Sequence, residues 1–277
     1  MIEREVRYEM LRPAQLRAEF ERAPLVFLPV APLEYHGPHL PVGTDPINAT
    51  QCALEACRQL GQGVVMPTLF LGTERERPDW MLESLGFQKG DWVIGMDFPT
   101  ATWKSHYYPE HIFGLMVAAT LEMLISQGYR AIVIVNGHGA WNQLETLDRL
   151  AKHYTRTSGA VVTWKLAVVL DISEKHLAGH ADLVETSLML HYEKTTFDGQ
   201  KIVDLSALPP RSVPIRYPDF SVVDGPGFSE KPSPGRIVQT DPRDATAEKG
   251  KKIFEDTVKM YVGIATDALQ KVHSTKK

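Results

Sequence analysis

The chain has 277 residues, of which 43% are hydrophobic and 23% charged, and its formal net charge is -4. This length can bury the core of one large domain, and the slightly acidic balance argues against nucleic acid or an anionic membrane as the partner. The longest apolar runs, such as residues 131–135, are far too short to span a membrane. The charged start lacks the apolar stretch of a signal peptide, and Cys52 and Cys57 are placed so that their side chains diverge on a predicted helix. We therefore expect a cytoplasmic protein without disulfides.

Strand and helix patterns alternate along the chain. The predicted helices and strands, in order, are a helix at 13–22, a strand at 25–31, a helix at 45–60, a strand at 63–67, a helix at 111–128, a strand at 130–136, a helix at 141–154, a strand at 160–170, and helices at 181–191 and 245–269. Asp45 is predicted to be the N-cap of the helix that Pro46 begins. This alternation predicts an α/β fold with a mostly parallel sheet that helices cover on both faces.

Two segments break the alternation. Residues 72–109 are polar and aromatic with weak periodicity, and residues 205–240 are rich in proline with few apolar runs. No internal repeat or clear domain boundary separates them from the rest. We interpret both as excursions from one domain that spans residues 1–277, and as candidates for lids or subunit contacts.

Polar side chains that can bind metals follow the predicted strands. Glu34 and His36 come directly after the strand at 25–31, in a loop too rich in glycine and proline for regular structure. His138 follows a second strand, and His180 and Glu185 lie a little beyond a third. Because ligands bind beyond the carboxyl ends of parallel strands, we expect these side chains to form one site.

Each of these residues also has a purely structural interpretation. Glu34 and His36 could be solvated loop residues, and Asp45 could do no more than cap its helix. His138 could be a hydrogen-bonded loop histidine, and Glu185 an ordinary carboxylate in the first turn of a helix. Taken singly, each residue favours the structural interpretation, whereas their joint arrangement favours a site.

The side chains in this arrangement indicate a metal centre. Carboxylates and imidazoles suit zinc, manganese or iron, whereas soft copper sites would need thiolates. A carboxylate such as Asp45 can give one oxygen to each of two ions. Two divalent ions about 3.5–4 Å apart can share a water and make it hydroxide near neutral pH.

Four motifs match a known family. They are LPVAPLEYHGPHLPVGTD at 28–45, IVNGHG at 134–139, GHADLVETSLML at 179–190 and TDPRDATAEKG at 240–250. Through them the sequence resembles the creatininase (creatinine amidohydrolase) family along nearly its whole length. The resemblance implies a three-layer α/β/α fold around a mostly parallel sheet, a dinuclear metal site and a homo-oligomer that is often a hexamer. We expect two divalent metal ions, with zinc favoured over manganese or iron.

The resemblance also assigns the metal ligands. It implies that Glu34, Asp45 and His138 hold one ion. It implies that His36 and Glu185 hold the other ion together with Asp45, which bridges the two.

His180 matches the family's catalytic histidine. The resemblance therefore implies that His180 carries a proton to the departing group, a role that suits an imidazole.

The differences from the family bear on the substrate. Creatininase proper has an acidic ligand two residues after the histidine of NGH, where this chain has Ala140. The chain reads NGHGAWN, so the role of Asn142 stays open and Trp141 is predicted to form part of the substrate pocket. These differences argue against creatininase proper.

The predicted reaction is attack by a metal-bound hydroxide on the carbonyl of a small cyclic substrate, with hydrolysis of an amide C–N bond. The alternative is a carbon–carbon ring-opening hydrolase of a cyclic polyol diketone, like the 3-dehydro-scyllo-inosose hydrolases of inositol catabolism. Trp103, His106 and Tyr107 in the excursion are predicted to bind substrate, and an exposed lid or subunit contact is the competing interpretation. A third class is a non-catalytic, metal-stabilised subunit or binder, against which the complete set of ligand positions argues.

Overall fold

Parallel strands form the centre of the protein. The computed structural model describes residues 4–84, 87–169, 179–213, 215 and 241–274. Within these residues the sheet has the order β2-β1-β3-β4, with β1 at Leu25–Val30, β2 at Val64–Val65, β3 at Ala131–Asn136 and β4 at Val161–Leu166. All neighbouring strands are parallel, and Val30, Asn136 and Leu166 pair in register. The carboxyl ends of β1, β3 and β4 therefore lie level with one another.

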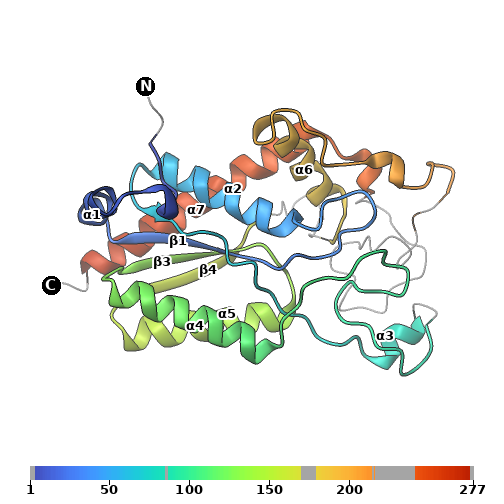
Figure 1. The fold of residues 1–277 in the computed structure, drawn as a ribbon, viewed down its shortest axis with the longest axis horizontal. Helices are drawn as coiled ribbons and strands as arrows, with labels where there is room; N and C mark the ends of the chain where they lie inside the picture. Colours follow the sequence, from blue (N-terminus) through green and yellow to red (C-terminus); the bar gives the residue numbers. More distant parts are fainter. Residues whose placement is uncertain (1–3, 85–86, 170–178, 214, 216–240, 275–277) are drawn as a thin grey trace.

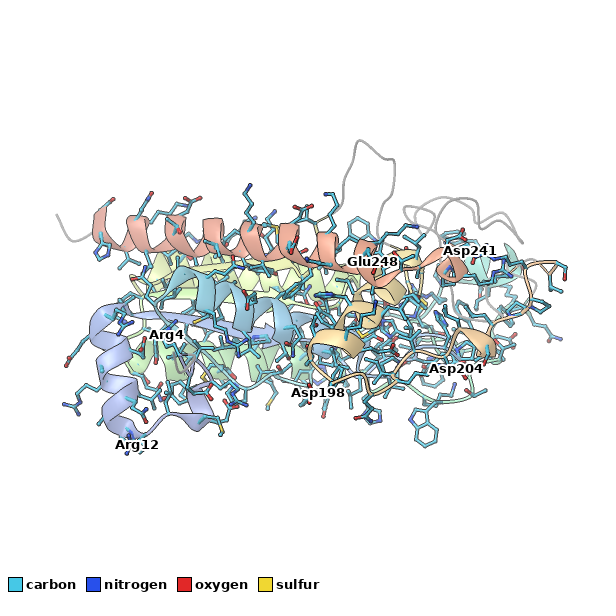
Figure 2. All side chains as sticks on the ribbon, turned by 90° about the horizontal axis from the view of Figure 1, so that it is seen from above. Arg4, Arg12, Asp198, Asp204, Asp241 and Glu248 are labelled. Carbon is cyan, nitrogen blue, oxygen red and sulfur yellow. The ribbon has the colours of Figure 1, made fainter. Side chains whose placement is uncertain are left out.

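Helices cover both faces of this sheet (Figure 1). The α-helices are α1 (Pro13–Arg22), α2 (Thr44–Leu60), α3 (Asp79–Ser84), α4 (Glu110–Ser126), α5 (Trp141–Thr157), α6 (Leu183–Thr195) and α7 (Ala247–Ser274), and short 3-10 helices lie at Tyr8–Met10 (η1), Leu205–Ala207 (η3) and Pro242–Asp244 (η4). Helices α2 and α7 lie on one face, and α4 and α5 on the other. Figure 2 shows α7 along one side of the molecule, with Glu248 near its start. The predicted three-layer α/β/α fold is confirmed.

Alternation along the strands explains the layers. Leu25 and Phe27 belong to the core beneath α2 and α7, whereas Val26 and Leu28 belong to the core beneath α4 and α5. Successive side chains of a strand point to opposite faces, so a parallel strand covered on both faces must be apolar throughout. Every residue of β1 and β3 is buried.

The predicted boundaries differ from the observed ones at several ends. The helix at 13–22 is confirmed, whereas the predicted strand at 160–170 is shorter and ends at Leu166, and residue 170 lies outside the described residues. The last helix begins at Ala247 and continues to Ser274. The 3-10 helix η4 ends at Asp244, and its C-cap Ala245 has an extended backbone, so the α-helix begins only after it.

The excursion at 72–109 has a small core of its own. Leu82, Val93, Met96 and Phe98 are buried together, and α3 lies to the side of the sheet (Figure 1). Of the excursion at 205–240, residues 216–240 lie outside the described residues. Among the described helices, none has the length and apolar character to cross a membrane.

Candidate metal centre

Five of the predicted site residues meet at the carboxyl end of the sheet. Glu34 and His36 come from the loop after β1, and His138 from the loop after β3. Asp45 and Glu185 lie in the first turns of α2 and α6. All are buried except Glu185, which is partly buried. The structure thus brings together side chains from four separate segments.

The position of Asp45 differs from the prediction. Asp45 is not the N-cap of α2, because the helix begins at Thr44 after Gly43 and no side chain caps it. Both the N–H and the hydroxyl of Thr44 donate to Pro41 O, at 3.1 and 2.8 Å, and this turn brings Asp45 inside the helix. The carboxylate of Asp45 is therefore directed at His36 and His138 rather than at the first N–H groups of α2.

Gly137, the glycine of the NGH motif, is required for a steric reason. A Cβ atom at Gly137 would lie 2.6 Å from the carbonyl oxygen of Asp45. Only glycine allows the end of β3 to approach the start of α2 so closely. This contact keeps His138 beside Asp45.

The donor atoms form two trios that share Asp45. In the first, His138 Nδ1 lies 3.1 Å from Glu34 Oε2 and 3.2 Å from Asp45 Oδ2. In the second, His36 Nε2 lies 3.1 Å from Asp45 Oδ1 and 3.5 Å from Glu185 Oε2. Each carboxylate oxygen of Asp45 thus faces a different trio.

These trios fit divalent metal ions. Ligand atoms about 2.0–2.2 Å from one zinc ion are roughly 3–3.6 Å from each other, which is the spacing observed here. Asp45 Oδ2 and His138 Nε2 are buried without a hydrogen-bond partner. A buried polar atom without a partner is costly, and a cation bound by Asp45 Oδ2 would remove that cost.

The charges of the centre also favour cations. Burial acts to lower the pKa of His36, but the Glu185 and Asp45 carboxylates outweigh it and raise this pKa well above its usual value. Burial likewise acts to raise the pKa of Glu34, but His138 and His180 hold it well below its usual value. The carboxylates and imidazoles of the centre therefore favour each other's charged forms, and metal ions can replace the protons of such imidazoles.

His180 is placed beside the trios with a defined tautomer. Its Nε2 lies 2.8 Å from the carbonyl oxygen of Tyr35, which can only accept, so Nε2 carries the hydrogen. Its Nδ1 then has a lone pair in the neutral ring and lies 3.8 Å from Glu34 Oε2. Burial and the neighbouring His36 lower the pKa of His180. The donor atoms of His180, Glu34 and His36 also lie within 4.8 Å of one another, so they form a third possible trio.

The start of α6 orients Glu185. Asp182 is the N-cap, and its carboxylate accepts from the N–H groups of Val184 and Glu185 at 2.9 and 3.2 Å. Ala181 adopts a positive φ of 53°, and its N–H donates to Glu185 Oε2 at 2.5 Å. A residue other than glycine in this conformation is strained, and the surrounding hydrogen bonds hold it there.

The four residues predicted to bind substrate lie in different surroundings. The hydroxyl of Tyr107 donates to Glu34 Oε1, so it contacts a predicted metal ligand. Trp141 borders the centre and is 68% exposed. Trp103 is 64% exposed and His106 bonds Leu33 O through its backbone N–H at 2.7 Å, and neither lines the cavity at the centre.

A cavity of about 420 Å³ opens onto the centre, and we call it the polar cavity. The side chains that make it polar, together with the tryptophan at its edge, are Glu34, Asp45, Glu74, Arg77, His138, Trp141, His180 and Glu185. Glu74 and Arg77 form an ion pair with a separation of 3.5 Å. The cavity therefore offers charged and hydrogen-bonding groups beside both trios.

A buried polar network that the sequence analysis missed supports His138. Gln143 Nε2 donates to Asn136 Oδ1 at 2.7 Å, and Asn136 Nδ2 donates to the carbonyl of His138 at 2.6 Å. The N–H of Thr73 donates to Gln143 Oε1, and Asn142 Nδ2 donates to Thr73 Oγ1. Asn142, whose role the sequence left open, thus ties α5 to the excursion. The sequence signal that could have revealed this network was a pair of adjacent amides, Asn142 and Gln143, at the start of α5. They lie on the buried face of the helix, which is usually apolar.

The fold is that of solved creatininases. An E122Q mutant creatininase of Zn-Zn type has a TM-score of 0.64 and 22% identity, and the match covers 96% of this chain and 99% of that one. A creatininase described as "Creatininase Mn" has a TM-score of 0.62 and 21% identity, with the same coverage. A putative creatinine amidohydrolase from Bacteroides fragilis NCTC 9343 has a TM-score of 0.61 and 20% identity, covering 96% of this chain and 98% of that one.

A sequence relative has a different name. The mycofactocin precursor peptide peptidase of Mycolicibacterium smegmatis (strain ATCC 700084 / mc(2)155) is 28% identical over 252 residues, which are 85% of this chain and 81% of that one. Fold, buried donor trios and relatives together define the protein as a metal-dependent hydrolase of the amidohydrolase type. The family model described as creatinine amidohydrolase matches residues 9–264, so the chain belongs to the creatininase family.

Proposed function

We propose that this protein hydrolyses the C–N bond of a small amide at a dinuclear centre of divalent metal ions. The cyclic amide predicted from the sequence is one member of this substrate class. The observation that carries the proposal is that the two carboxylate oxygens of Asp45 face different histidines. Oδ1 lies 3.1 Å from His36 Nε2, and Oδ2 lies 3.2 Å from His138 Nδ1. A carboxylate directed at two donor sets in this way is the arrangement a bridging ligand needs.

The ligands would be divided as the resemblance implies. Glu34, His138 and Asp45 Oδ2 would hold one ion, and His36, Glu185 and Asp45 Oδ1 the other. When bound, the ions would polarise a carbonyl oxygen and lower the pKa of water. Zinc is our first choice, with manganese or iron as alternatives, because these donors suit all three and relatives include forms named for zinc and manganese.

His180 would carry the proton of the reaction. Since Nε2–H is engaged by the Tyr35 carbonyl, Nδ1 is the atom that can accept a proton from the attacking water. The water oxygen bonds to the carbonyl carbon, the C–N bond breaks, and Nδ1 returns the proton to the leaving nitrogen. The hydroxyl of Tyr107, which donates to Glu34, would fix the orientation of this carboxylate.

The names of the relatives favour cleavage of C–N rather than C–C bonds. The family model is described as creatinine amidohydrolase, and a sequence relative is named a precursor peptide peptidase. The carbon–carbon alternative has no such support. A single domain, a homo-hexamer and a cytoplasmic location stay predictions.

The test combines metal analysis with a substrate panel. The full chain, loaded with zinc or manganese, is expected to bind two ions per chain by elemental analysis and to hydrolyse lactams, cyclic imides or linear amides. Turnover of cyclic diketones alone would support the carbon–carbon alternative. Two bound ions with no turnover of any compound would instead indicate a non-catalytic binder.

A further inference from the structure

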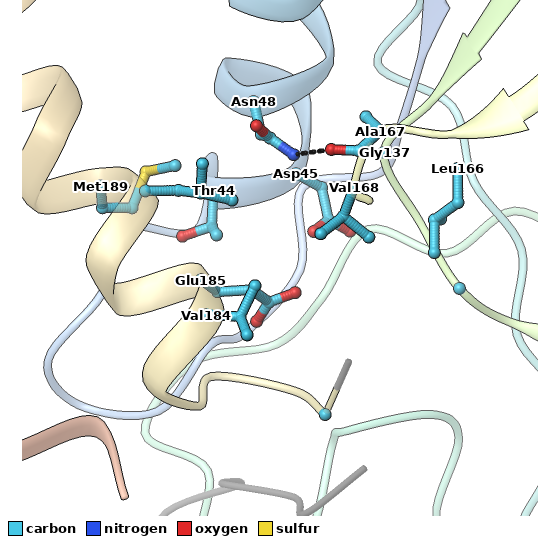
Figure 3. Close-up of a pocket in the computed structure, with 13 residues that line it drawn as sticks. Thr44, Asp45, Asn48, Gly137, Leu166, Ala167, Val168, Val184, Glu185 and Met189 are labelled. Carbon is cyan, nitrogen blue, oxygen red and sulfur yellow. Dashed lines mark hydrogen bonds between the residues drawn. The ribbon is translucent and has the colours of Figure 1, made fainter. Parts of the chain in front are cut away.

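A second cavity, of about 280 Å³, adjoins the same centre (Figure 3). We call it the apolar cavity. It shares with the polar cavity the residues Asp45, Gly137, Gly139, Gly179 and Glu185. In Figure 3 the carboxylates of Asp45 and Glu185 point into it beside Val168 and Val184. The two predicted metal ligands therefore stand at the boundary between two spaces.

Hydrocarbon makes up most of the wall of this cavity. Its apolar side chains are Leu166, Val168, Val184, Leu188 and Met189. Two polar side chains in the wall already have partners, because Thr44 Oγ1 donates to Pro41 O and Asn48 Nδ2 donates to Ala167 O at 2.6 Å. Apart from the two carboxylates of the centre, the cavity thus offers surface that gains by excluding water.

The polar cavity has the opposite character. It contains the ion pair of Glu74 and Arg77 and two of the site histidines. His180 lines the polar cavity and does not line the apolar one. A bound molecule that spans the centre would meet charge on one side and hydrocarbon on the other.

The position of His180 determines the orientation in which an amide substrate would bind. In amide hydrolysis the water oxygen bonds to the carbonyl carbon, the C–N bond breaks, and the nitrogen leaves with a proton. If His180 delivers that proton, the nitrogen lies on the side of the polar cavity. The acyl group then extends from the carbonyl carbon to the other side, into the apolar cavity.

We propose that the apolar cavity is the acyl subsite, and that the substrates are amides of an aliphatic acyl group with a polar leaving amine. This inference rests on the proposed function and makes its substrate class narrower. Val168 and Val184 stand beside the carboxylates and would contact the first carbons of the acyl chain. Longer chains would reach Leu188 and Met189.

The test uses a series with one leaving group. N-acetylglycine, N-butanoylglycine and N-hexanoylglycine differ only in methylene groups, and their hydrolysis is measured with the metal-loaded full chain. Burial of one methylene changes the rate roughly fourfold if the gain is expressed in the transition state. We expect kcat/KM to rise more than about tenfold from acetyl to butanoyl.

A variant locates the effect in the cavity. Val168→Trp fills the space next to the centre, so it should lower kcat/KM for N-hexanoylglycine far more than for N-acetylglycine and so remove the chain-length dependence. Val213→Trp is the matched control, because Val213 is 46% exposed and lies outside both cavities. The control should keep the full dependence on chain length. Equal rates across the series, or an equal loss for all three amides in Val168→Trp, would overturn the acyl subsite.

Binding separates this inference from the proposed reaction. Butanoate and hexanoate are titrated into the metal-loaded protein by calorimetry, which needs no turnover. If no amide is hydrolysed but affinity rises with chain length and Val168→Trp removes the rise, the subsite stands and the proposed reaction fails. If amides are hydrolysed and neither rate nor affinity depends on chain length, the reaction stands and the subsite fails.

Discussion

The two ends of the parallel sheet differ in what they bury. At the amino end, Leu25 of β1 pairs with Ala131 of β3, and both belong to the core that contains Cys57 and Leu269. At the carboxyl end the same two strands lead into loops whose buried side chains include Glu34 and His138. One pair of strands thus has hydrocarbon at one end and charge at the other.

The difference shows where stability and chemistry are located. Burial of apolar surface at the amino end stabilises the fold without any ligand. Burial of carboxylates and imidazoles at the other end costs free energy that only paired charges or bound cations offset. The amino end should therefore respond to substitution through the free energy of unfolding, and the carboxyl end through metal binding and turnover.

The largest expected effect is that of Asp45→Ala. Because the two oxygens of Asp45 face both trios, we expect the variant to lose both ions and all measurable turnover. Elemental analysis of the purified protein checks this. Asp267→Ala, on an exposed part of α7, is the matched control and should keep both ions and full turnover. A variant at Asp45 that retained two ions would refute the bridging role.

His180→Ala should separate turnover from metal binding. We expect both ions to remain and kcat to fall by about 10²–10⁴, the usual contribution of a general acid–base. His153→Ala, on the exposed side of α5, is the control. Loss of one ion from His180→Ala would instead point to the trio that His180 forms with Glu34 and His36.

Leu25→Ala tests the other end of the sheet. Leu25 is completely buried, so we expect the free energy of unfolding to fall by about 2–5 kcal/mol, with metal content per folded chain unchanged. Denaturant unfolding measures the first quantity and elemental analysis the second. Leu115→Ala, at a leucine that is 64% exposed, should change stability little. Metal loss from folded Leu25→Ala would contradict the division between the two ends.

The fold was largely predictable because its signal is local. The continuous apolar runs of β1 and β3 identify buried parallel strands without knowledge of their partners. The position of Asp45 was not predictable to one residue, because Asp-Pro is typical both of a cap and of a first turn. The turn that decides between them is formed by Thr44 and Pro41.

The site was only partly predictable because some of its contacts are distant in sequence. The motif residues Glu34 and His138 could be named as candidates, and the structure brings them together. Tyr107 bonds Glu34 across 73 residues, and Thr73 bonds Gln143 across 70. Both contacts depend on how the excursion at 72–109 folds back onto the sheet, which no periodicity in that segment indicates.

Tyr107→Phe gives the smallest expected effect and tests this long-range contact. The hydroxyl of Tyr107 donates to Glu34 Oε1 and so leaves Oε2, 3.1 Å from His138 Nδ1, directed at the first trio. Removing this hydroxyl should lower the affinity for one of the two ions by about 10–100-fold, because partners that orient a metal ligand usually contribute this much to metal affinity. Competition with a chelator measures the two affinities separately. Tyr108→Phe is the adjacent control, at a side chain that is 41% exposed, and it should leave both affinities unchanged. Equal weakening of both ions by Tyr107→Phe would show that the excursion supports the whole centre rather than Glu34 alone.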